Sequence, residues 1–378
     1  MLKASVSPVV SSNYLKYLSP RSYPFLSHYH HHHQQKQYRA LRTTTTTTFT
    51  FSKPPTHHPG PRTLTSSLFL QRNSKTSYIT TALLLASITA AVVYQQQSQQ
   101  SNMSSKLIPS NPDDVMVIRD VTPNVVTFSV PFLRFGRIPI GGRGTAVKLT
   151  NGSIALFSPV ALTESAKAKI ASMGNDVRYL VATDIEHHIF LSQWKSAYPG
   201  AKLVGVEGLP EKRAKAAPSD PQIGAEPFDV VFTKENKLGL KVDEDFDRDF
   251  EHEYVDGHAN KELVFLYRPD RVLIQADLMF NLPAVEQYSR VPEAEKPKPG
   301  FLERFFMGLQ STEGDAKGMK RFLWYMASKP DRASFDESVR RIQGWDFDTI
   351  IPCHGETIVG GGKAVFDKVF EWHLNGKN

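Results

Sequence analysis

Histidines and carboxylates gather in one short stretch of this 378-residue sequence, in a pattern that could bind a metal ion. The stretch RYLVATDIEHHIFLSQW, residues 178–194, places Asp184, Glu186, His187 and His188 directly after an apolar run. Imidazole nitrogens and carboxylate oxygens are ligands that suit zinc, iron or manganese. The stretch therefore poses a choice between a metal-binding loop and an ordinary polar strand end.

Three more polar residues follow apolar, strand-like runs later in the chain, namely His258, Asp277 and His354. In open α/β folds the loops after several strands converge at one edge, where sites are built. A lone His at such a place is more often a solvated or capping residue, and His252 and His373 are interpreted in that way. Because four of the six histidines beyond the first 112 residues share this location with Asp277, we predict a metal site.

The elements that must position these residues can be read from the flanking sequence. The runs NVVTFSVPF and TAVKLTNGSIALFSP predict strands, the second turning back at Asn151-Gly152, a strong hairpin signal. LTESAKAKIASMG predicts a helix capped by Thr163 and closed by Gly174. Strands are also predicted over 179–182 and 202–206, so the first half alternates strands with helices.

The second half of the chain also combines predicted strands and helices. Two apolar strands joined at RPDR lead to Asp277, and helices are predicted for FLERFFMGL, GMKRFLWYMAS and SFDESVRRIQG. The strand FDTIIP then leads to CHGE, and a last helix is predicted from Ala364 to Leu374. The fold class expected for 113–378 is one α/β domain, and the single cysteine, Cys353, excludes a disulfide within the chain.

Four segments in this order, EHHIFLSQW, DGHANKELVF, VLIQADLMFN and IIPCHGE, resemble the metallo-β-lactamase fold superfamily. Within that superfamily they look like a branch of domains of unknown function with an altered metal motif. The resemblance covers roughly Asp113 to His373. It implies an α+β sandwich of four layers, αββα, and a metal-dependent hydrolase.

The superfamily's usual signature after the strand is Thr-His-x-His-x-Asp-His, and this chain departs from it. Read from Thr183, the chain offers Asp184, Glu186 and His188 where His, His and Asp are expected. Slipped by one residue, His187 and His188 occupy the Asp-His positions. Both registers remain open, and because adjacent residues of an extended chain point in opposite directions, one of the two histidines is expected to contact the metal.

The resemblance also assigns roles to the other residues. In the family the "GH" histidine completes one metal, the late "HG" histidine completes the second, and the strand-end Asp bridges the two. The expected ligands are His187, His188, His258, Asp277 and His354. Asp184 and Glu186 are the expected catalytic proton acceptors.

The predicted function is therefore hydrolysis of a small molecule with a divalent metal, zinc first and iron or manganese as alternatives, and with no organic cofactor. The bond attacked would depend on the inserted segment from Ala284 to Ser328. The alternative is a non-catalytic, membrane-tethered binding domain descended from the same fold.

The first 112 residues contain no Asp or Glu and eleven Lys or Arg. Residues 1–75 are predicted to be a disordered leader of the mitochondrial transit type. The apolar run within 76–97 predicts a transmembrane anchor, and 98–112 a linker. We expect a mitochondrial membrane location for the full chain, and a cytoplasmic one if translation starts at Met103.

Net charge excludes one class of partner. Without the eleven basic residues of the leader, 34 Lys and Arg face all 38 Asp and Glu, a net charge of −4. The overall excess of +7 thus comes from the leader, and no nucleic-acid surface is expected on the folded part.

Overall fold

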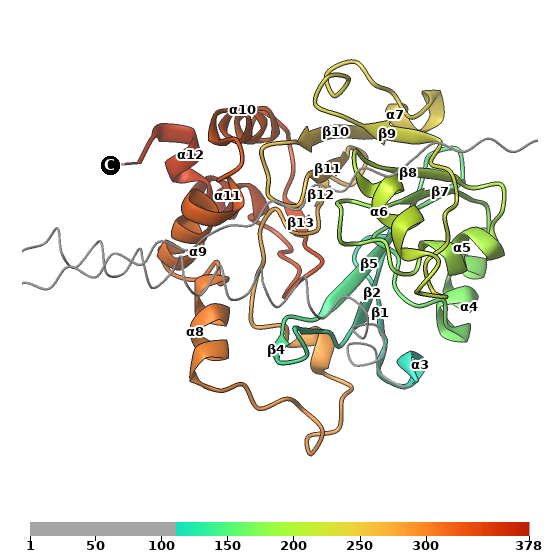
Figure 1. Cartoon of the computed structure of the whole chain (residues 1–378), viewed down its shortest axis with the longest axis horizontal. Coiled ribbons are helices and arrows are strands. Elements are labelled where there is room, and N and C mark those ends of the chain that lie inside the picture. The colour runs from blue at the N-terminus through green and yellow to red at the C-terminus, as the bar shows by residue number, and fades with distance from the viewer. Residues whose placement is uncertain (1–110, 378) are drawn as a thin grey trace, which may run out of the picture. The chain divides into compact units, whose positions relative to one another are not determined.

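The computed structural model describes residues 111–377, which form a mixed α/β fold of two main β-sheets with helices on their outer faces (Figure 1). The predicted leader (1–75), the predicted anchor (76–97) and all but the end of the predicted linker lie outside the described residues. Among the helices of residues 111–377, none is long and apolar enough to span a bilayer.

The strands are β1 (Val117–Asp120), β2 (Val125–Val130), β3 (Leu133–Arg134), β4 (Ile138–Pro139), β5 (Gly142–Lys148), β6 (Ile154–Phe157), β7 (Val177–Val181), β8 (Lys202–Val206), β9 (Val230–Phe232), β10 (Phe250–Val255), β11 (Glu262–Tyr267), β12 (Val272–Ile274) and β13 (Thr349–Ile351). The helices are α3 (Pro112–Val115), α4 (Glu164–Met173), α5 (Leu191–Ala197), α6 (Leu209–Ala216), α7 (Glu244–Asp249), η1 (Glu286–Tyr288), α8 (Phe301–Leu309), α9 (Lys317–Phe322), η2 (Leu323–Ala327), α10 (Arg332–Gln343), α11 (Gly362–Val369) and α12 (Glu371–Asn375).

The larger sheet has the strand order β1-β2-β5-β6-β7-β8-β9. Its first three strand pairs are antiparallel and its last three are parallel. The turn at Asn151-Gly152 joins β5 to β6, as predicted. Helix α4 also agrees with the prediction, because Thr163 accepts a hydrogen bond from the backbone N–H of Ala166 and Gly174 ends the helix with a φ of 127°.

The smaller sheet has the order β10-β11-β12-β13, in which β11 is antiparallel to both neighbours and β12 is parallel to β13. Strands β10, β12 and β13 therefore run in one direction, and their C-terminal ends lie at one edge of the sheet. The residues just beyond these three ends include His258, Asp277 and His354. The topology thus brings together loops that are far apart in sequence.

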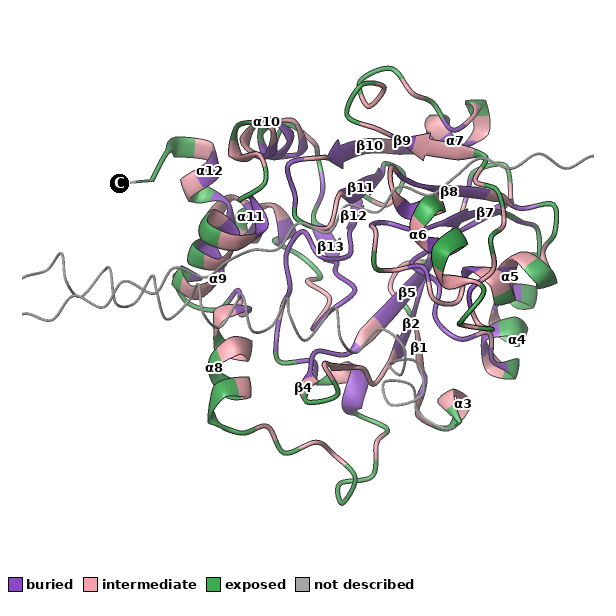
Figure 2. Ribbon diagram, in the orientation of Figure 1, coloured by how far each residue is buried: buried purple, intermediate pink, exposed green. Residues whose placement is uncertain are grey.

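Strand β11 shows how the layers pack. All six of its residues are buried, and successive side chains point to opposite faces. Phe265 faces the other sheet, where its ring lies 4.9 Å from that of Phe157 in β6, whereas Val264 and Leu266 belong to the core under the helices that follow β12. Helices α4 to α6 cover the larger sheet and α9 to α12 the smaller one, so the order is helix, sheet, sheet, helix (Figure 2).

The inserted segment contains both predicted helices: FLERFFMGL is α8, and GMKRFLWYMAS is α9 followed by η2. Phe306 and Met307 of α8 pack on the core, while Phe301, Leu302 and Phe305 are exposed. The predicted last helix is two short ones, α11 and α12, and the short β3–β4 hairpin has no counterpart among the predicted elements.

Candidate metal centre

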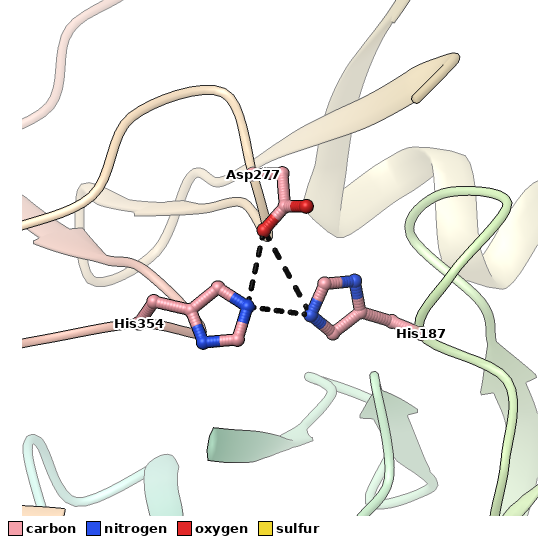
Figure 3. A group of neighbouring side chains, drawn as sticks. All are labelled: His187, Asp277 and His354. Atoms are coloured by element: carbon pink, nitrogen blue, oxygen red, sulfur yellow. Dashed lines mark hydrogen bonds and ion pairs between the residues drawn. The ribbon is translucent and has the colours of Figure 1, made fainter. Parts of the chain in front are cut away.

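Three of the predicted ligands meet where the loops after β7, β12 and β13 converge (Figure 3). His187, Asp277 and His354 each offer one ligand atom, and these atoms lie within 4.8 Å of one another. The Nε2 atom of His354 is 3.1 Å from Oδ1 of Asp277. The Nε2 atom of His187 is 3.2 Å from that of His354 and 3.9 Å from the same Asp277 oxygen. Within residues 111–377 this is the one such group of three.

Both imidazole rings are held through their Nδ1 atoms. His354 Nδ1 lies 2.6 Å from the carbonyl oxygen of Gly141, and a carbonyl can only accept, so the hydrogen is on Nδ1. His187 Nδ1 lies 2.9 Å from Oδ1 of Asp184, which also accepts two backbone N–H groups, from Glu186 and His187, at 2.7 Å each. In the neutral rings both Nε2 lone pairs therefore face Asp277.

This arrangement fits a bound cation. Two Nε2 lone pairs and a carboxylate oxygen converge without a donor among them, and Oδ1 of Asp277 is buried with no hydrogen-bond partner within residues 111–377. A proton on His187 can supply the missing positive charge. Burial lowers the pKa of His187, but the carboxylates of Asp184 and Asp277 outweigh this effect and raise that pKa to about 10. A divalent ion meets the same need with the same atoms, so the donor set fits zinc, iron or manganese.

A third buried acid lies behind Asp277. The carboxylate oxygens of Glu262 accept the backbone N–H groups of Ala276, at 2.6 Å, and of Asp277, at 3.0 Å. Burial, and then the charges of Asp184 and Asp277, raise the pKa of Glu262 well above its usual range. Crowded buried acids favour a cation among them, because it offsets their mutual repulsion.

Cys353, next to His354, does not act as a thiolate in this arrangement. It is fully buried, and burial raises the pKa of its thiol well above its usual value. A thiol nucleophile needs a depressed pKa and access to solvent. The environment of Cys353 therefore gives no support to a thiol nucleophile pair with His354.

His188 faces away from the triad and toward helix α6. Its Nδ1 atom is 3.4 Å from Nη1 of Arg213, which donates to the carbonyl oxygen of His188 at 2.8 Å. Burial and the positive charges of Lys212 and Arg213 lower the pKa of His188 to about 3. Of the two adjacent histidines, His187 is the one brought to Asp277 and His354.

His258 is buried near the triad but is not part of it. Its Nδ1 atom accepts the backbone N–H of Asn260 at 3.1 Å, so the ring hydrogen lies on Nε2 and no free lone pair remains. Burial lowers the pKa of His258, although the carboxylates of Asp277 and Asp184 oppose this. In this tautomer the ring is a hydrogen-bond donor.

The two predicted proton acceptors have different environments. Asp184 is fully buried, and one of its oxygens holds His187 and the loop backbone. The Glu186 side chain is 47% exposed and forms an ion pair with Nζ of Lys212 at 2.9 Å. Asp184 thus positions a triad residue, and Glu186 is the acceptor that solvent can reach.

Sequence reasoning did not find several residues that build this centre. Gly141 supplies the carbonyl that orients His354, and buried Arg143 donates to the carbonyl oxygens of Pro352, at 2.7 Å, and of Gly355, at 2.6 Å. A Cβ atom at Gly355 would lie 2.1 Å from the carbonyl oxygen of Asn281, so only glycine fits beside His354. Gly141 and Arg143 lie in the segment GGRG, residues 141–144, and Gly355 lies in CHGE, residues 353–356, but neither segment shows from sequence that the two would meet.

Comparisons with known proteins concern the fold. No protein-family model and no curated protein sequence matches the chain. Among solved structures, a metallo-β-lactamase from Pontibacter korlensis is similar at 13% identity, covering 69% of this chain and 99% of that one, with a TM-score of 0.42. A metallo-β-lactamase from Hirschia baltica is 11% identical, covering 68% and 97%, with a TM-score of 0.38.

The flavodiiron core of Flv1 from Synechocystis is also similar, at 11% identity over 68% of this chain and 60% of that one, with a TM-score of 0.43. These proteins belong to the superfamily that the sequence motifs resemble. At such identities and TM-scores the likeness gives no information on the metal, the substrate or the reaction of this chain.

Proposed function

We propose that this protein is a metal-dependent hydrolase acting on a small molecule, with one divalent ion held by His187, Asp277 and His354. The observation that carries the proposal is the convergence of three acceptor atoms within 4.8 Å. The tautomers of both histidines are fixed by hydrogen bonds from their Nδ1 atoms. Zinc is the ion proposed first, and iron or manganese suit the same donors.

The chain's own residues would prepare this ion's surroundings. A bound divalent ion would supply a water of lowered pKa and polarise an oxygen of the substrate. Asp184 and the Gly141 carbonyl hold the two rings, and Glu262 holds the backbone at Asp277. Glu186 is the proposed proton acceptor, which requires its ion pair with Lys212 to open.

The test uses the full chain purified without added metal. We expect about one equivalent of metal by elemental analysis, and turnover of at least one member of a panel of ester, thioester, amide and phosphodiester substrates that disappears on chelation. Glu186→Gln should lower the rate by roughly 100-fold or more while keeping the metal. A metal-free protein, or turnover that survives chelation, contradicts the proposal.

A non-catalytic, metal-containing binding domain is the second candidate. It is favoured by the ion pair at 2.9 Å that ties Glu186, the proposed proton acceptor, to Nζ of Lys212. A structural ion would give the same metal content and the same thermal stabilisation. Metal retained without turnover of any substrate in the panel would favour this candidate.

We also propose that the full chain is anchored in a mitochondrial membrane by residues 76–97. The acid-free leader and the apolar run support this, as do the exposed Phe301, Leu302 and Phe305 of α8, which suit a lipid surface. A C-terminal fluorescent tag should mark mitochondria for the full chain and become diffuse when translation starts at Met103. A diffuse signal from the full chain contradicts the anchor.

A further inference from the structure

The β3–β4 hairpin is attached directly to the triad. The ring of Phe132, which precedes β3, stacks on that of His354 with 6.1 Å between centroids. The residue that orients His354, Gly141, follows β4 and donates its N–H to the carbonyl oxygen of Phe132 at 3.1 Å. Both ends of the hairpin are therefore fixed at His354, and its position is set by the site.

Strand alternation decides which hairpin residue faces the site. Leu133 pairs with Pro139 and Arg134 with Ile138, and the ladder continues to Phe132, which accepts the N–H of Ile140 at 3.2 Å. Side chains two residues apart lie on one face of an extended chain. Because Phe132 faces His354, the side chain of Arg134 lies on the same side.

The guanidinium of Arg134 has no ion pair or hydrogen bond with any of residues 111–377, and its Cζ atom lies 5.2 Å from the centroid of the Phe135 ring. Arg137 in the same hairpin differs, because it is exposed and pairs with Glu303 of α8 at 3.4 Å. Phe135, in the turn of the hairpin, has a positive φ of 55°, which is unfavourable for a residue with a side chain.

We infer that Arg134 binds an anionic group of the substrate, a carboxylate or a phosphate, beside the triad. The inference rests on the proposed function and narrows its substrate to small molecules that carry an oxyanion near the bond attacked. A guanidinium suits this role because it is always charged and can donate two parallel hydrogen bonds to two oxygens.

Inorganic phosphate and acetate are the probes, titrated by calorimetry into the full, metal-loaded chain. Arg134→Gln should weaken phosphate binding about 10- to 100-fold, the size expected for losing a charge-assisted bidentate contact. Arg134→Lys should recover part of this loss. The matched control, Arg137→Gln, removes a guanidinium from the same hairpin and should bind phosphate like the wild type. Stronger binding of phosphate or of acetate would show which oxyanion the site prefers.

Metal content is measured for every variant, so that two failures can be told apart. If the wild type binds no metal, the proposed function fails and the anion site fails with it. If the metal-loaded wild type binds neither probe, or if Arg134→Gln binds both as tightly as the wild type, the anion site alone is wrong. Unchanged metal content together with weakened phosphate binding in Arg134→Gln supports it.

Discussion

The predicted metal site has two halves, one of His187, Asp277 and His354 and the other of His258 and Glu186. Both contain histidine and carboxylate, but they differ in whether the ligand atoms already have hydrogen-bond or ion-pair partners. On one side His187 and His354, in their neutral forms, turn Nε2 lone pairs toward Asp277. On the other side the Nδ1 lone pair of His258 already accepts a backbone N–H, and Glu186 is already paired with Lys212. Histidine and carboxylate are therefore not enough for a metal site; the atoms must converge and lack donors of their own.

The largest effect should come from removing a triad ligand. His354→Ala leaves a poor site with two protein ligands, so about one equivalent of metal should be lost on purification. His258→Gln should retain the metal, since its ring has no lone pair to give. Elemental analysis of both variants compares the two halves directly. His252→Ala is the control, because that ring lies in β10, 4.9 Å from the ring of Phe232.

The next effect concerns the adjacent histidines. His187→Ala should lose metal as His354→Ala does, whereas His188→Ala should keep it and lose stability instead, because the buried Arg213 loses a neighbour. Metal analysis and thermal unfolding, measured on the same preparations, separate the two outcomes. Loss of metal in His188→Ala but not in His187→Ala would reverse the assignment.

Chelation should lower the melting temperature of the wild type. The three ligands come from separate loops and meet only in the folded chain, so bound metal stabilises the fold by mass action. At a free metal concentration of about 100 Kd this is about 2.7 kcal/mol, or roughly 5 to 10 °C for a domain of this size. His354→Ala should not respond to the chelator. An equal response in both proteins would place the metal elsewhere.

A smaller effect is expected when a residue that accepts a hydrogen bond from a metal ligand is changed. Asp184→Asn keeps the shape of the side chain but offers His187 a neutral acceptor, so metal affinity should fall on the order of 10- to 100-fold. Competition with a chelator of known affinity measures it. Complete loss of metal would mean that Asp184 is itself a ligand, and an unchanged affinity would mean that it does not orient His187.

The smallest effect tests a buried histidine outside the centre. Burial lowers the pKa of His373, although Asp336 accepts from its ring at 2.6 Å. A folded-state pKa below the unfolded value of 6.5 means that the unfolded chain takes up the proton first. The contribution of His373 to stability should therefore be constant above pH 6.5 and fall below it, by up to about 1.4 kcal/mol per pH unit. Denaturant unfolding with chelator present should show a flatter acid limb for His373→Gln.

Local sequence signals predicted much of the fold. The Asn151-Gly152 turn, the Thr163 cap and strand 202–206 all agree with the structure, because each depends on residues close in the chain. The β3–β4 hairpin was not predicted, because its strands are two residues long and its turn contains Phe135 at positive φ. No periodicity or turn signal indicates an element so short.

The sequence by itself determined the composition of the site and its place in the fold: histidines and acids after the strands that end at one edge, with His187, Asp277 and His354 among them. Only the tertiary structure decided which of these residues meet. The side chains of His187 and His188 point in different directions; Asp184 accepts a hydrogen bond from the His187 ring, and Arg213 donates one to the carbonyl oxygen of His188. Arg213 comes from another element, α6, and the meeting of His187 with Asp277 and His354 depends on the whole fold, so the ligands of the site could not be read from residue order.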